Sequence, residues 1–443
     1  MSFNIGLSGL YAANKSLDVT GNNIANVATT GFKSSRVEFA DQYAQSIRGT
    51  SGSSNVGSGV TTAAVSQQFT QGTLTTGTAN SLDLAINGNG FFMLSNNGES
   101  LYTRAGAFHT DKDGYVVNSS GQNLQGYNVD ANGNVVIGAL SDLKIDSSNL
   151  EPKSTTSITN KANLNSAATA PTISPFDATE TSSYNVKYST PIYDTQGNAH
   201  TLDQYFVKTG TNAWSMYSLV DGRSISDPVN STTPDEVKLT FDSSGALITS
   251  GTGAPVGSDN VSLNTDGTFQ VANWQPAAQV GTGTTATWAL NGANGTVDGI
   301  KLNMMDTTQT ASVSGLISQS QDGYATGQIS AMNVDATGNL FATYTNGQSK
   351  VIGQISLTNF ANVQGLAPAG GTNWRETYAS GVPVSGVPES GTLGYLTGQA
   401  LEDSNVDLTG ELVNLIKAQS NYQANAKTIS TQSTIMQTTI QMA

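Results

Sequence analysis

Apolar residues recur with a helical spacing at both ends of the chain. Alternate steps of four and three residues from Phe3 reach Leu7, Leu10, Leu17 and Ile24, with weak positions at Asn14 and Gly21. The same steps near the C-terminus pass through Leu408, Leu412, Leu415, Tyr422, Ile429, Met436 and Ile440. This spacing is typical of amphipathic helices that pack as in a coiled coil. It predicts a helical domain made of 1–28 and 402–443, in which "SNVD" at 404–407 has the spacing of a capping box.

The outer faces of these two helices carry very few charges. Residues 1–30 contain only Lys15 and Asp18, and residues 412–443 contain only Lys417 and Lys427. A solvated helix normally exposes a charged face, whereas these faces consist of Gln, Asn, Ser, Thr and Ala. Packing of the helices within one chain is one interpretation. The scarcity of charge favours a second one, in which the helices pack against other copies and drive assembly.

Between the helices, a short turn motif, D-x-x-G, recurs before runs of apolar or alternating residues. It occurs as "DKDG" at 111–114, "DANG" at 130–133, "DTQG" at 194–197, "DSSG" at 242–245 and "DATG" at 335–338. Asp at the first position and Gly at the fourth suit a type I turn that closes a bulged antiparallel hairpin. Helical patterns are scarce in this part, which argues against a Rossmann or barrel enzyme. The predicted fold class is mainly β with α-helical termini.

Changes in composition divide the chain into nested parts. A Gly/Ser-rich connector occupies 46–59, a Thr/Ala-rich stretch occupies 151–175, and a Pro/Gly loop occupies 378–398. We expect a connector at 29–72 with 396–401, a discontinuous inner β-domain at 73–150 with 319–395, and an outer β-domain at 151–318. The two β-domains are expected to be antiparallel, with the outer one inserted in the inner one.

Composition and charge exclude several classes of function. Charged residues make up 11% of the 443 residues, and the net charge is −14, which argues against binding to nucleic acid or to an anionic membrane. No stretch reaches the roughly 20 apolar residues of a membrane span, so stable membrane insertion is not expected. The chain has no cysteine, which excludes disulfides and thiolate metal sites. The opening residues do not resemble a cleavable signal peptide, so we expect any export to proceed without one.

The sequence contains no motif of an active site. The two histidines, His109 and His200, each lie in a hairpin-like segment, and we expect both on strand surfaces. "INGNGFF" at 86–92 fails the dinucleotide fingerprint, and "DKDG" lacks the remaining ligands of a calcium loop. A pair of carboxylates for glycoside cleavage stays open because sequence spacing does not decide spatial proximity. We expect no catalytic residue, no cofactor and no metal, and hence a protein that is not an enzyme.

The stretch "GNNIANVATTGFKSSR" at 21–36 marks the end of the first helix. Gly31 suits the position after a helix C-terminus, and Phe32 suits the hydrophobic contact beyond it. Asn22 and Asn26 lie four residues apart on one helical face, with Asn23 beside them. Such amides can fix the register between packed chains, as a buried Asn does in a coiled coil. A plain polar helix end is the alternative.

Four stretches resemble a known family. The opening "GLSGLYAANKSLDVTGNNIANVATTGFKSSRVEF" resembles the N-terminal signature of bacterial flagellar rod and hook proteins, and "ALEDSNVDLTGELVNLIKAQSNYQANAKTISTQSTIMQTTIQMA" resembles their C-terminal signature. The β-domain of that family is resembled by "LDLAINGNGFFML" with "YTRAGAFHTDKDGYVVNSSGQNLQGY", and by "GQISLTNFANVQGLAPAGGTNWRETYASG". The segment 188–222 resembles the outer domain of the hook members. The resemblance covers both ends and the middle of the chain in the family's order.

The resemblance implies a structural subunit of the flagellar hook. Such subunits assemble into a flexible curved tube that transmits torque from the rod to the filament, with terminal helices inside and β-domains outside. It also implies contacts with the rod, the hook cap and the hook–filament junction proteins, and an extracellular location reached through the flagellar type III export apparatus. A distal rod subunit is the nearest alternative. A secreted β-rich adhesin is a more remote one, since it would not explain the paired terminal stripes.

Overall fold

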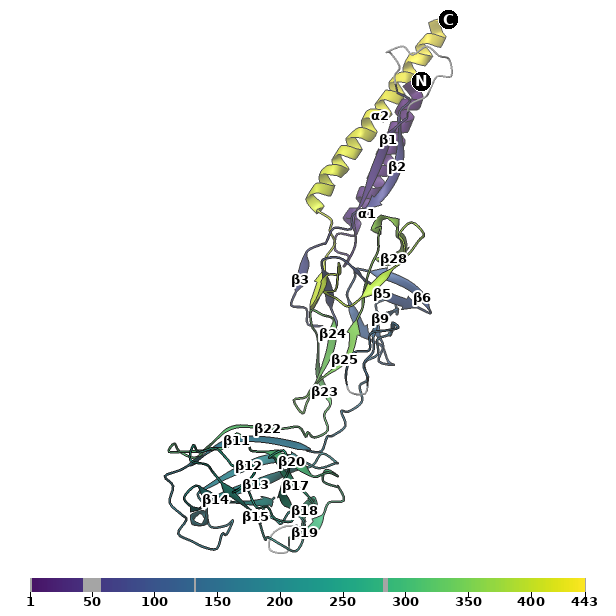
Figure 1. Ribbon diagram of the computed structural model, residues 1–443. Coiled ribbons are helices and arrows are strands. Elements are labelled where there is room, and N and C mark those ends of the chain that lie inside the picture. The colour runs from purple at the N-terminus through teal and green to yellow at the C-terminus, as the bar shows by residue number, and fades with distance from the viewer. Residues whose placement is uncertain (1, 43–56, 131–132, 282–285, 443) are drawn as a thin grey trace. The chain divides into compact units, whose positions relative to one another are not determined.

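The chain folds into two compact units, seen in a computed structural model that describes residues 2–42, 57–130, 133–281 and 286–442 (Figure 1). The first unit comprises Met1–Ser147, Ile329–Thr343 and Ser349–Ala443, and the second comprises Ser148–Gln328 and Tyr344–Gln348. Within the described residues, α-helix occurs only near the two ends, and strands dominate the rest. The predicted fold class is therefore confirmed. The predicted insert, 151–318, falls inside the second unit.

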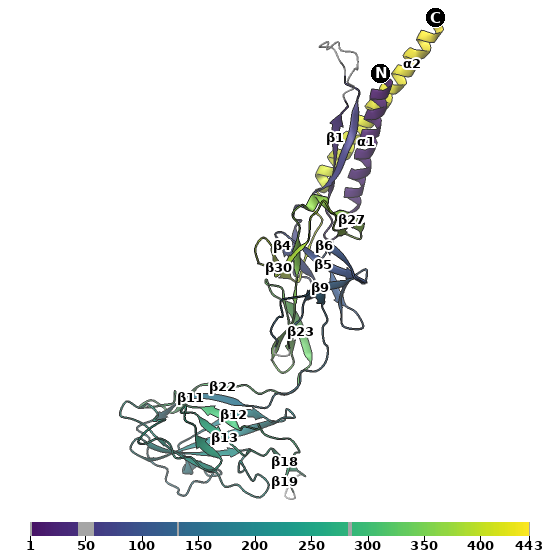
Figure 2. The same ribbon diagram turned by 45° about the vertical axis from the view of Figure 1, so that its right-hand side comes forward.

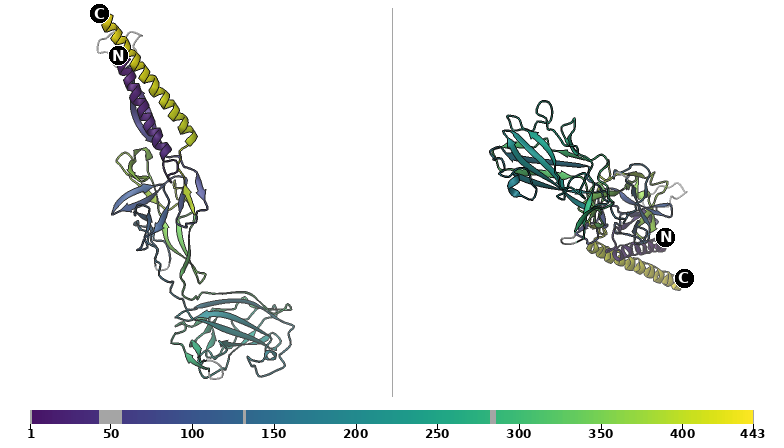
Figure 3. Two further views of the ribbon diagram at one scale, coloured as in Figure 1. Left: turned by 180° about the vertical axis from the view of Figure 1, so that it is seen from behind. Right: turned by 90° about the horizontal axis from the view of Figure 1, so that it is seen from below.

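The two terminal helices lie side by side (Figures 1 and 3). Helix α1 spans Ser2–Ala25 and α2 spans Leu408–Met442, so they are about 36 and 52 Å long. The carboxylate of Asp407 caps α2 by accepting a hydrogen bond of 3.0 Å from the Thr409 N–H. The expected capping box on Ser404 is wrong, because Ser404 Oγ accepts from the Val406 N–H before the helix begins. No helix in the described ranges has the length and apolar character needed to cross a membrane.

The expected connector at 29–72 contains an antiparallel hairpin, which lies along α1 (Figure 2). Its strands are β1, Ser35–Asp41, and β2, Val60–Gln67. Ser8 Oγ of α1 accepts a hydrogen bond of 3.2 Å from the Val60 N–H at the start of β2. Most of the Gly/Ser-rich stretch at 46–59 lies outside the described residues.

Below the helices, early and late strands pair and hold the two halves of the first unit together. Strand β3, Leu74–Thr76, pairs with β31, Ala400–Glu402, and β4, Leu84–Asn87, pairs with β30, Tyr395–Gly398. Residues more than 300 positions apart therefore share one β-structure.

The β-domain of the first unit is a thirteen-stranded sheet. Its main path runs β23-β24-β25-β9-β5-β6-β28-β27. The bounds are β5 Phe91–Asn96, β6 Glu99–Thr103, β7 Phe108–Thr110, β8 Val116–Asn118, β9 Asn123–Tyr127, β10 Ser141–Asp142, β23 Ile329–Val334, β24 Asn339–Tyr344, β25 Ser349–Ile355, β26 Leu357–Asn359, β27 Ala367–Gly370, β28 Asn373–Arg375 and β29 Val384–Gly386. A short 3-10 helix, η3, spans Val363–Gly365. An aliphatic core and a smaller aromatic cluster with Phe91, Tyr102, Phe360 and Trp374 support this sheet.

The second unit consists of two main sheets around one core. One sheet has the order β12-β13-β14-β15, and the other contains β16, β17, β20, β11, β21 and β22. The bounds are β11 Ser157–Asn165, β12 Val186–Tyr193, β13 Ala199–Gly210, β14 Ala213–Val220, β15 Asp235–Thr240, β16 Val261–Leu263, β17 Phe269–Val271, β18 Ala277–Val280, β19 Thr287–Leu290, β20 Ile300–Asn303, β21 Thr308–Thr310 and β22 Gly315–Gln321. A 3-10 helix, η1, spans Thr181–Ser183, and β18 and β19 form a separate hairpin. Phe206, Trp214 and Phe269 are fully buried in the shared core.

One feature of the second unit departs from the prediction. Strand β11 is parallel to both β20 and β21, and antiparallel to β22. Parallel neighbours need a long connection, and the chain between β11 and β20 contains eight strands, which is more than enough. The expectation of purely antiparallel pairing, which came from the hairpin turns alone, is therefore wrong for β11.

The D-x-x-G turns form as predicted. The fourth-position glycines, Gly114, Gly133, Gly197, Gly245 and Gly338, all have φ between 82° and 85°. In each turn the glycine N–H donates to the carbonyl oxygen of the Asp at the first position, over 3.0–3.2 Å. A left-handed glycine after a type I turn produces the bulge that lets the two strands continue with the right twist.

The histidines differ from the expectation at one position. His109 is exposed on β7, as predicted. His200 on β13 is buried, with Nδ1 2.7 Å from Asp221 Oδ2 and Nε2 3.4 Å from Asp194 Oδ2. The expected surface position of His200 is therefore wrong, because the turn at 194–197 and the end of β14 bring two carboxylates over the ring.

Candidate assembly site

The contact between α1 and α2 is built from small and polar residues. On α1, the buried residues are Gly6, Ala13 and Thr20, which repeat every seven residues, and Asn23, which follows three residues later. A Cβ added to Gly6 would lie 3.1 Å from Ile429 Cγ1, and one added to Gly9 would lie 2.5 Å from Asn425 Oδ1. The two glycines therefore allow α2 to approach α1 closely. We call this contact the small-residue seam.

The predicted apolar stripe of α1 lies one residue along from this seam. Leu7, Leu10, Leu17 and Ile24 are half-buried. One residue along a helix corresponds to a rotation of about 100°. The stripe of α1 is therefore turned partly away from α2, and it is not the main contact between the two helices.

Helix α2 leaves most of its apolar residues exposed. The exposed members of the predicted stripe are Leu408, Leu412, Tyr422, Met436 and Ile440, while Leu415 and Ile429 are half-buried on the side of α1. Val413, Ile416 and Ile435 are exposed as well. In the 35 residues of α2, Ala418 is fully buried and no other described residue is. The single chain thus uses only a narrow part of the apolar surface of α2.

Asn23 connects both helices to the hairpin. Its side chain donates 2.8 Å to the Ser35 carbonyl oxygen and accepts 2.9 Å from the Ser35 N–H. The same amide donates 3.1 Å to Glu411 Oε1 on α2. Asn23 is 1% exposed, so these hydrogen bonds are shielded from water. Its amide is therefore engaged within the chain, which differs from the register contact between chains that we considered for it.

Asn405 makes a similar connection just before α2. Its Oδ1 accepts 2.8 Å from the Ser34 N–H, and its Nδ2 donates 2.6 Å to the Gln68 carbonyl oxygen. It also donates to the carbonyl and hydroxyl oxygens of Thr70. Together with Asn23, it fixes where the helices meet the hairpin.

A buried ionic cluster lies beneath this junction. Lys33 Nζ is 2.5 Å from Glu402 Oε1, and Arg104 Nη1 is 3.3 Å from Glu402 Oε2. Lys33 also donates 2.8 Å to the Thr70 carbonyl oxygen, and Arg104 donates to the carbonyl oxygens of Ile86 and Gly88. The carboxylate is completely buried, so two cations share one anion away from water.

The electrostatics of the cluster follow from this burial. Burial lowers the pKa of Lys33 below its usual value, and the charge and hydrogen bond of Glu402 offset part of the effect. Burial also lowers the pKa of Arg104, again against the opposing charge of Glu402. Removal of one partner from such a group leaves an uncompensated buried charge. The cluster therefore holds the N-terminal motif to β31, the strand that precedes α2.

The remaining predicted junction residues have different positions. Helix α1 ends at Ala25, so Gly31 is not its C-terminal cap, and that expectation is wrong. Gly31 has φ +69°, and a Cβ there would lie 2.4 Å from the Ala105 nitrogen, so the position needs glycine for a close approach to the sheet. Asn26 Nδ2 donates 2.9 Å to the Asn22 carbonyl oxygen, while Asn22 itself is exposed.

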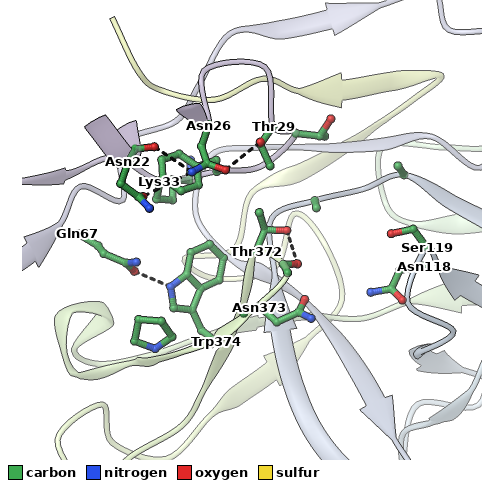
Figure 4. Close-up of a pocket in the computed structure, with 17 residues that line it drawn as sticks. Asn22, Asn26, Thr29, Lys33, Gln67, Asn118, Ser119, Thr372, Asn373 and Trp374 are labelled. Carbon is green, nitrogen blue, oxygen red and sulfur yellow. Dashed lines mark hydrogen bonds between the residues drawn. The ribbon is translucent and has the colours of Figure 1, made fainter. Parts of the chain in front are cut away.

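Asn22, Asn26 and Phe32 line a surface cleft of about 630 Å³ (Figure 4). Figure 4 shows Asn22, Asn26 and Thr29 along one side and Thr372, Asn373 and Trp374 along the other, with Gln67 and Asn118 at the two ends. Trp374 Nε1 donates 2.5 Å to Gln67 Oε1, which ties β28 to the end of β2. We call this feature the Asn22 cleft.

Sequence reasoning missed Lys33, Arg104, Glu402 and Asn405. All four lie inside the stretches that resemble the flagellar family, in "TTGFKSSR", "YTRAGAF" and "ALEDSN". Charged residues are rare in this chain, and Lys33, Arg104 and Glu402 each lie in a family-like motif, which is the signal that could have identified them. Their meeting could not be predicted, because they lie far apart in the sequence; Lys33 and Glu402, for example, are 369 positions apart.

Models of known families match most of the chain. The matched descriptions are "Flagella basal body rod protein" at 3–33, "Flagellar hook protein FlgE/F/G D1 domain" at 85–166, "Flagellar basal body protein FlaE D2 domain" at 163–324, and "Flagellar basal body rod FlgEFG protein C-terminal" at 397–442. The terminal matches contain the two helices and the junction. The D2 match falls within the second unit.

Whole proteins are also similar to this chain. The flagellar hook protein FlgE of Escherichia coli is 39% identical over 100% of both chains, and that of Borreliella burgdorferi is 35% identical over 99% of this chain and 98% of the relative. Among solved structures, the Helicobacter pylori flagellar hook protein FlgE2 aligns with a TM-score of 0.46 and 15% identity, over 74% of this chain and 98% of the other. The full-length identity to relatives of this name places the chain in the flagellar hook protein FlgE family.

Proposed function

We propose that this chain is the structural subunit of a flagellar hook, which polymerises into a flexible curved tube that carries torque from the rod to the filament. The observation that supports this function is the unpaired apolar surface of α2. Leu412, Ile416, Met436 and Ile440 are between 45% and 73% exposed, although a soluble monomer gains nothing from displaying them.

The energetics favour contacts between copies. Full burial of one Leu, Ile or Met side chain contributes about 1.5–3 kcal/mol. Several such residues on each subunit, repeated along a polymer, suffice to drive association. The residues of the two helices thus form two groups. The exposed stripe of α2 and the outward part of the α1 stripe contact neighbouring copies. The small-residue seam holds α1 to α2 within one copy.

The second unit distinguishes the hook from the alternatives. A distal rod subunit would share the terminal helices, but the D2 match at 163–324 and the full-length relatives favour a hook subunit. A secreted adhesin would not need paired terminal helices with exposed apolar stripes. No observation on the described residues favours an enzyme.

Further partners follow from the family. We propose that the polymer contacts the rod at its proximal end and the hook cap and hook–filament junction proteins at its distal end. The chain would reach this extracellular position through the flagellar export apparatus without a cleaved signal peptide. Its lack of cysteine suits passage as an unfolded chain. Its low charge suits β-domains that slide during bending, because few ion pairs would hold one register.

Electron microscopy of two matched variants tests the role of α2. The first replaces Leu412, Ile416 and Met436 by Ser. The control replaces Val256, Val280 and Val297 of the second unit by Ser, three apolar residues that are between 56% and 98% exposed. We expect tubes from the wild-type chain and the control, and none from the α2 variant. Tubes from all three proteins would exclude α2 as the main source of assembly energy.

A second pair of variants addresses Asn22 and Asn26. Replacement of both by Ala removes the hydrogen bond from Asn26 to the Asn22 carbonyl oxygen and the one from the Thr29 hydroxyl to Asn26, both at the end of α1. If the amides only finish the helix, the polymer should be near normal. If they set register between copies, as we propose, the polymer should be lost or misassembled. The control is Asn14→Ala, on an exposed position of the same helix.

A further inference from the structure

A loop of the first unit displays apolar side chains that nothing in the described chain covers. It runs over 377–384, from the segment after β28 to the first residue of β29, and we call it the Tyr378 loop. Tyr378 is 105% exposed, Val382 is 81% exposed and Val384 is 67% exposed. Residues 377–384 carry no charge. Exposed apolar side chains that cluster in this way mark interaction sites in soluble proteins.

The loop is held in a defined conformation. Ser380 is completely buried, and its Oγ accepts 2.9 Å from the Thr377 N–H. Thr377 Oγ1 donates 2.5 Å to the Gly365 carbonyl oxygen, and Asn362 Nδ2 donates 3.0 Å to the Ala379 carbonyl oxygen. A Cβ on Gly365 would lie 2.4 Å from the Ala379 carbonyl carbon, so the loop packs directly on η3. Tyr378 is therefore presented by a preorganised loop, which reduces the entropic cost of binding.

The Asn22 cleft on the same β-domain has the complementary chemistry. Phe32 and Pro368 supply apolar surface above the buried Trp374, and Asn22, Asn26 and Asn118 supply amides. Lys33 is the only charged residue that lines the cleft, and its ammonium is bound to Glu402 beneath it. Docking of a neutral loop would therefore desolvate no free charge, which is the usual large cost of such a contact.

A tyrosine side chain fits this combination. Its ring is apolar, and its hydroxyl both donates and accepts hydrogen bonds, so it can contact Phe32 and Pro368 while bonding to an amide at the rim. Tyr378 is fully exposed and does not line its own cleft. One copy therefore carries both parts of the contact and leaves both unfilled.

We propose that the Tyr378 loop of one copy docks into the Asn22 cleft of a neighbouring copy. The two surfaces differ, so the contact is heterologous, and its repetition can add copies along an open helical array instead of closing a two-fold dimer. This inference rests on the proposed function and adds to the helices a specific contact between β-domains. It also gives the exposed Asn22 and the half-buried Asn26 a place in assembly.

Photo-crosslinking in the polymer tests the contact. Tyr378 is replaced by p-benzoylphenylalanine, the variant is assembled with an excess of wild-type chain, and crosslinked peptides are identified by mass spectrometry after illumination. We expect dimers whose crosslinks fall in 22–33, 118–119 or 368–374 of the other copy. The control carries the same group at Tyr395, which is 42% exposed on β30, and should not label these segments. Crosslinks elsewhere, or none in intact tubes, would overturn the proposal.

Substitution gives an independent measurement. Tyr378→Ala should raise the concentration needed for polymerisation by about tenfold or more, as expected for an aromatic anchor. Tyr378→Phe should restore most of the loss. An unchanged threshold for Tyr378→Ala would contradict the contact. Failure of the wild-type chain to form tubes would instead refute the proposed function, so the two failures can be distinguished.

Discussion

Helix α2 and strand β13 show two different relations between sequence and burial. In α2, one of 35 residues is fully buried, and large apolar side chains face outward. In β13, five consecutive residues from Leu202 to Phe206 are buried within the second unit. The strand reaches its final environment inside one chain, whereas the helix does not. The second unit thus buries its apolar residues within a single chain. The helical part of the first unit leaves them exposed and forms one side of an interface.

The polar residues support the same distinction. In the second unit, the buried Trp214 donates a hydrogen bond of 2.8 Å from Nε1 to Gln309 Oε1, so this polar atom finds its partner inside the core. In α2, the Thr and Asn side chains at 425, 428, 434 and 438 bond back to carbonyl oxygens of their own helix. Such bonds leave the surface of the helix neutral and free to pack against another apolar surface.

The largest expected effect is in the core of the second unit. Trp214→Ala should destabilise that unit by about 3–5 kcal/mol, because it leaves a cavity among fully buried residues. Thermal unfolding monitored by tryptophan fluorescence measures the loss. Trp288→Ala, at a half-buried position on β19, is the control and should cost clearly less. Equal losses would mean that the core does not depend on Trp214.

A comparable effect is expected at the ionic cluster of the first unit. Glu402→Gln should cost about 3–5 kcal/mol, since Lys33 and Arg104 would remain buried without their anion. Urea unfolding of the first unit measures it. The matched control is Glu99→Gln, which removes a half-exposed pair with Arg375 and should cost less than about 1 kcal/mol. If both variants lose the same free energy of unfolding, the ionic cluster that joins the two terminal segments is not important for stability.

The exposed apolar residues of α2, in contrast, should contribute little to the stability of the monomer. In the monomer, Leu412→Ser and Ile416→Ser should each change the free energy of unfolding by no more than about 0.5 kcal/mol, because both side chains are already exposed. Hydrogen exchange and denaturant unfolding of the unassembled chain measure this. A large change in the free energy of unfolding of the monomer would show that these side chains already belong to a packed core. Helix α2 and strand β13 would then not differ in this respect.

The smallest expected effect is a pH dependence of the second unit. Burial alone would lower the pKa of His200, but the hydrogen bonds and charges of Asp221 and Asp194 outweigh it and raise the pKa. A raised pKa in the folded state stabilises the fold below the unfolded value near 6.5, and this stabilisation is lost as the pH rises through the folded pKa. Unfolding of the second unit should therefore occur at a higher temperature at pH 6 than at pH 9. In His200→Gln that difference should shrink, whereas His109→Gln should leave it unchanged.

Sequence reasoning identified the helices because their apolar stripes are long and regular. It missed the seam between them, since Gly6, Ala13 and Thr20 carry no hydrophobic signal. It also missed the hairpin of β1 and β2, whose residues were assigned to a connector on the basis of the Gly/Ser-rich stretch between them. The position of Gly31 was informative for a different reason than expected: a close approach to the sheet, and not a helix end, requires glycine there.

The local structure of this protein follows from its sequence alone. The D-x-x-G turns, the two helices and the scarcity of charge depend on neighbouring residues and on composition, so they can be read without a fold. Contacts between distant residues depend instead on the three-dimensional fold, as for Lys33 with Glu402, Asn23 with Glu411, and β11 with its parallel neighbours. These contacts join positions far apart in the chain, and their stability comes from burial that exists only after folding.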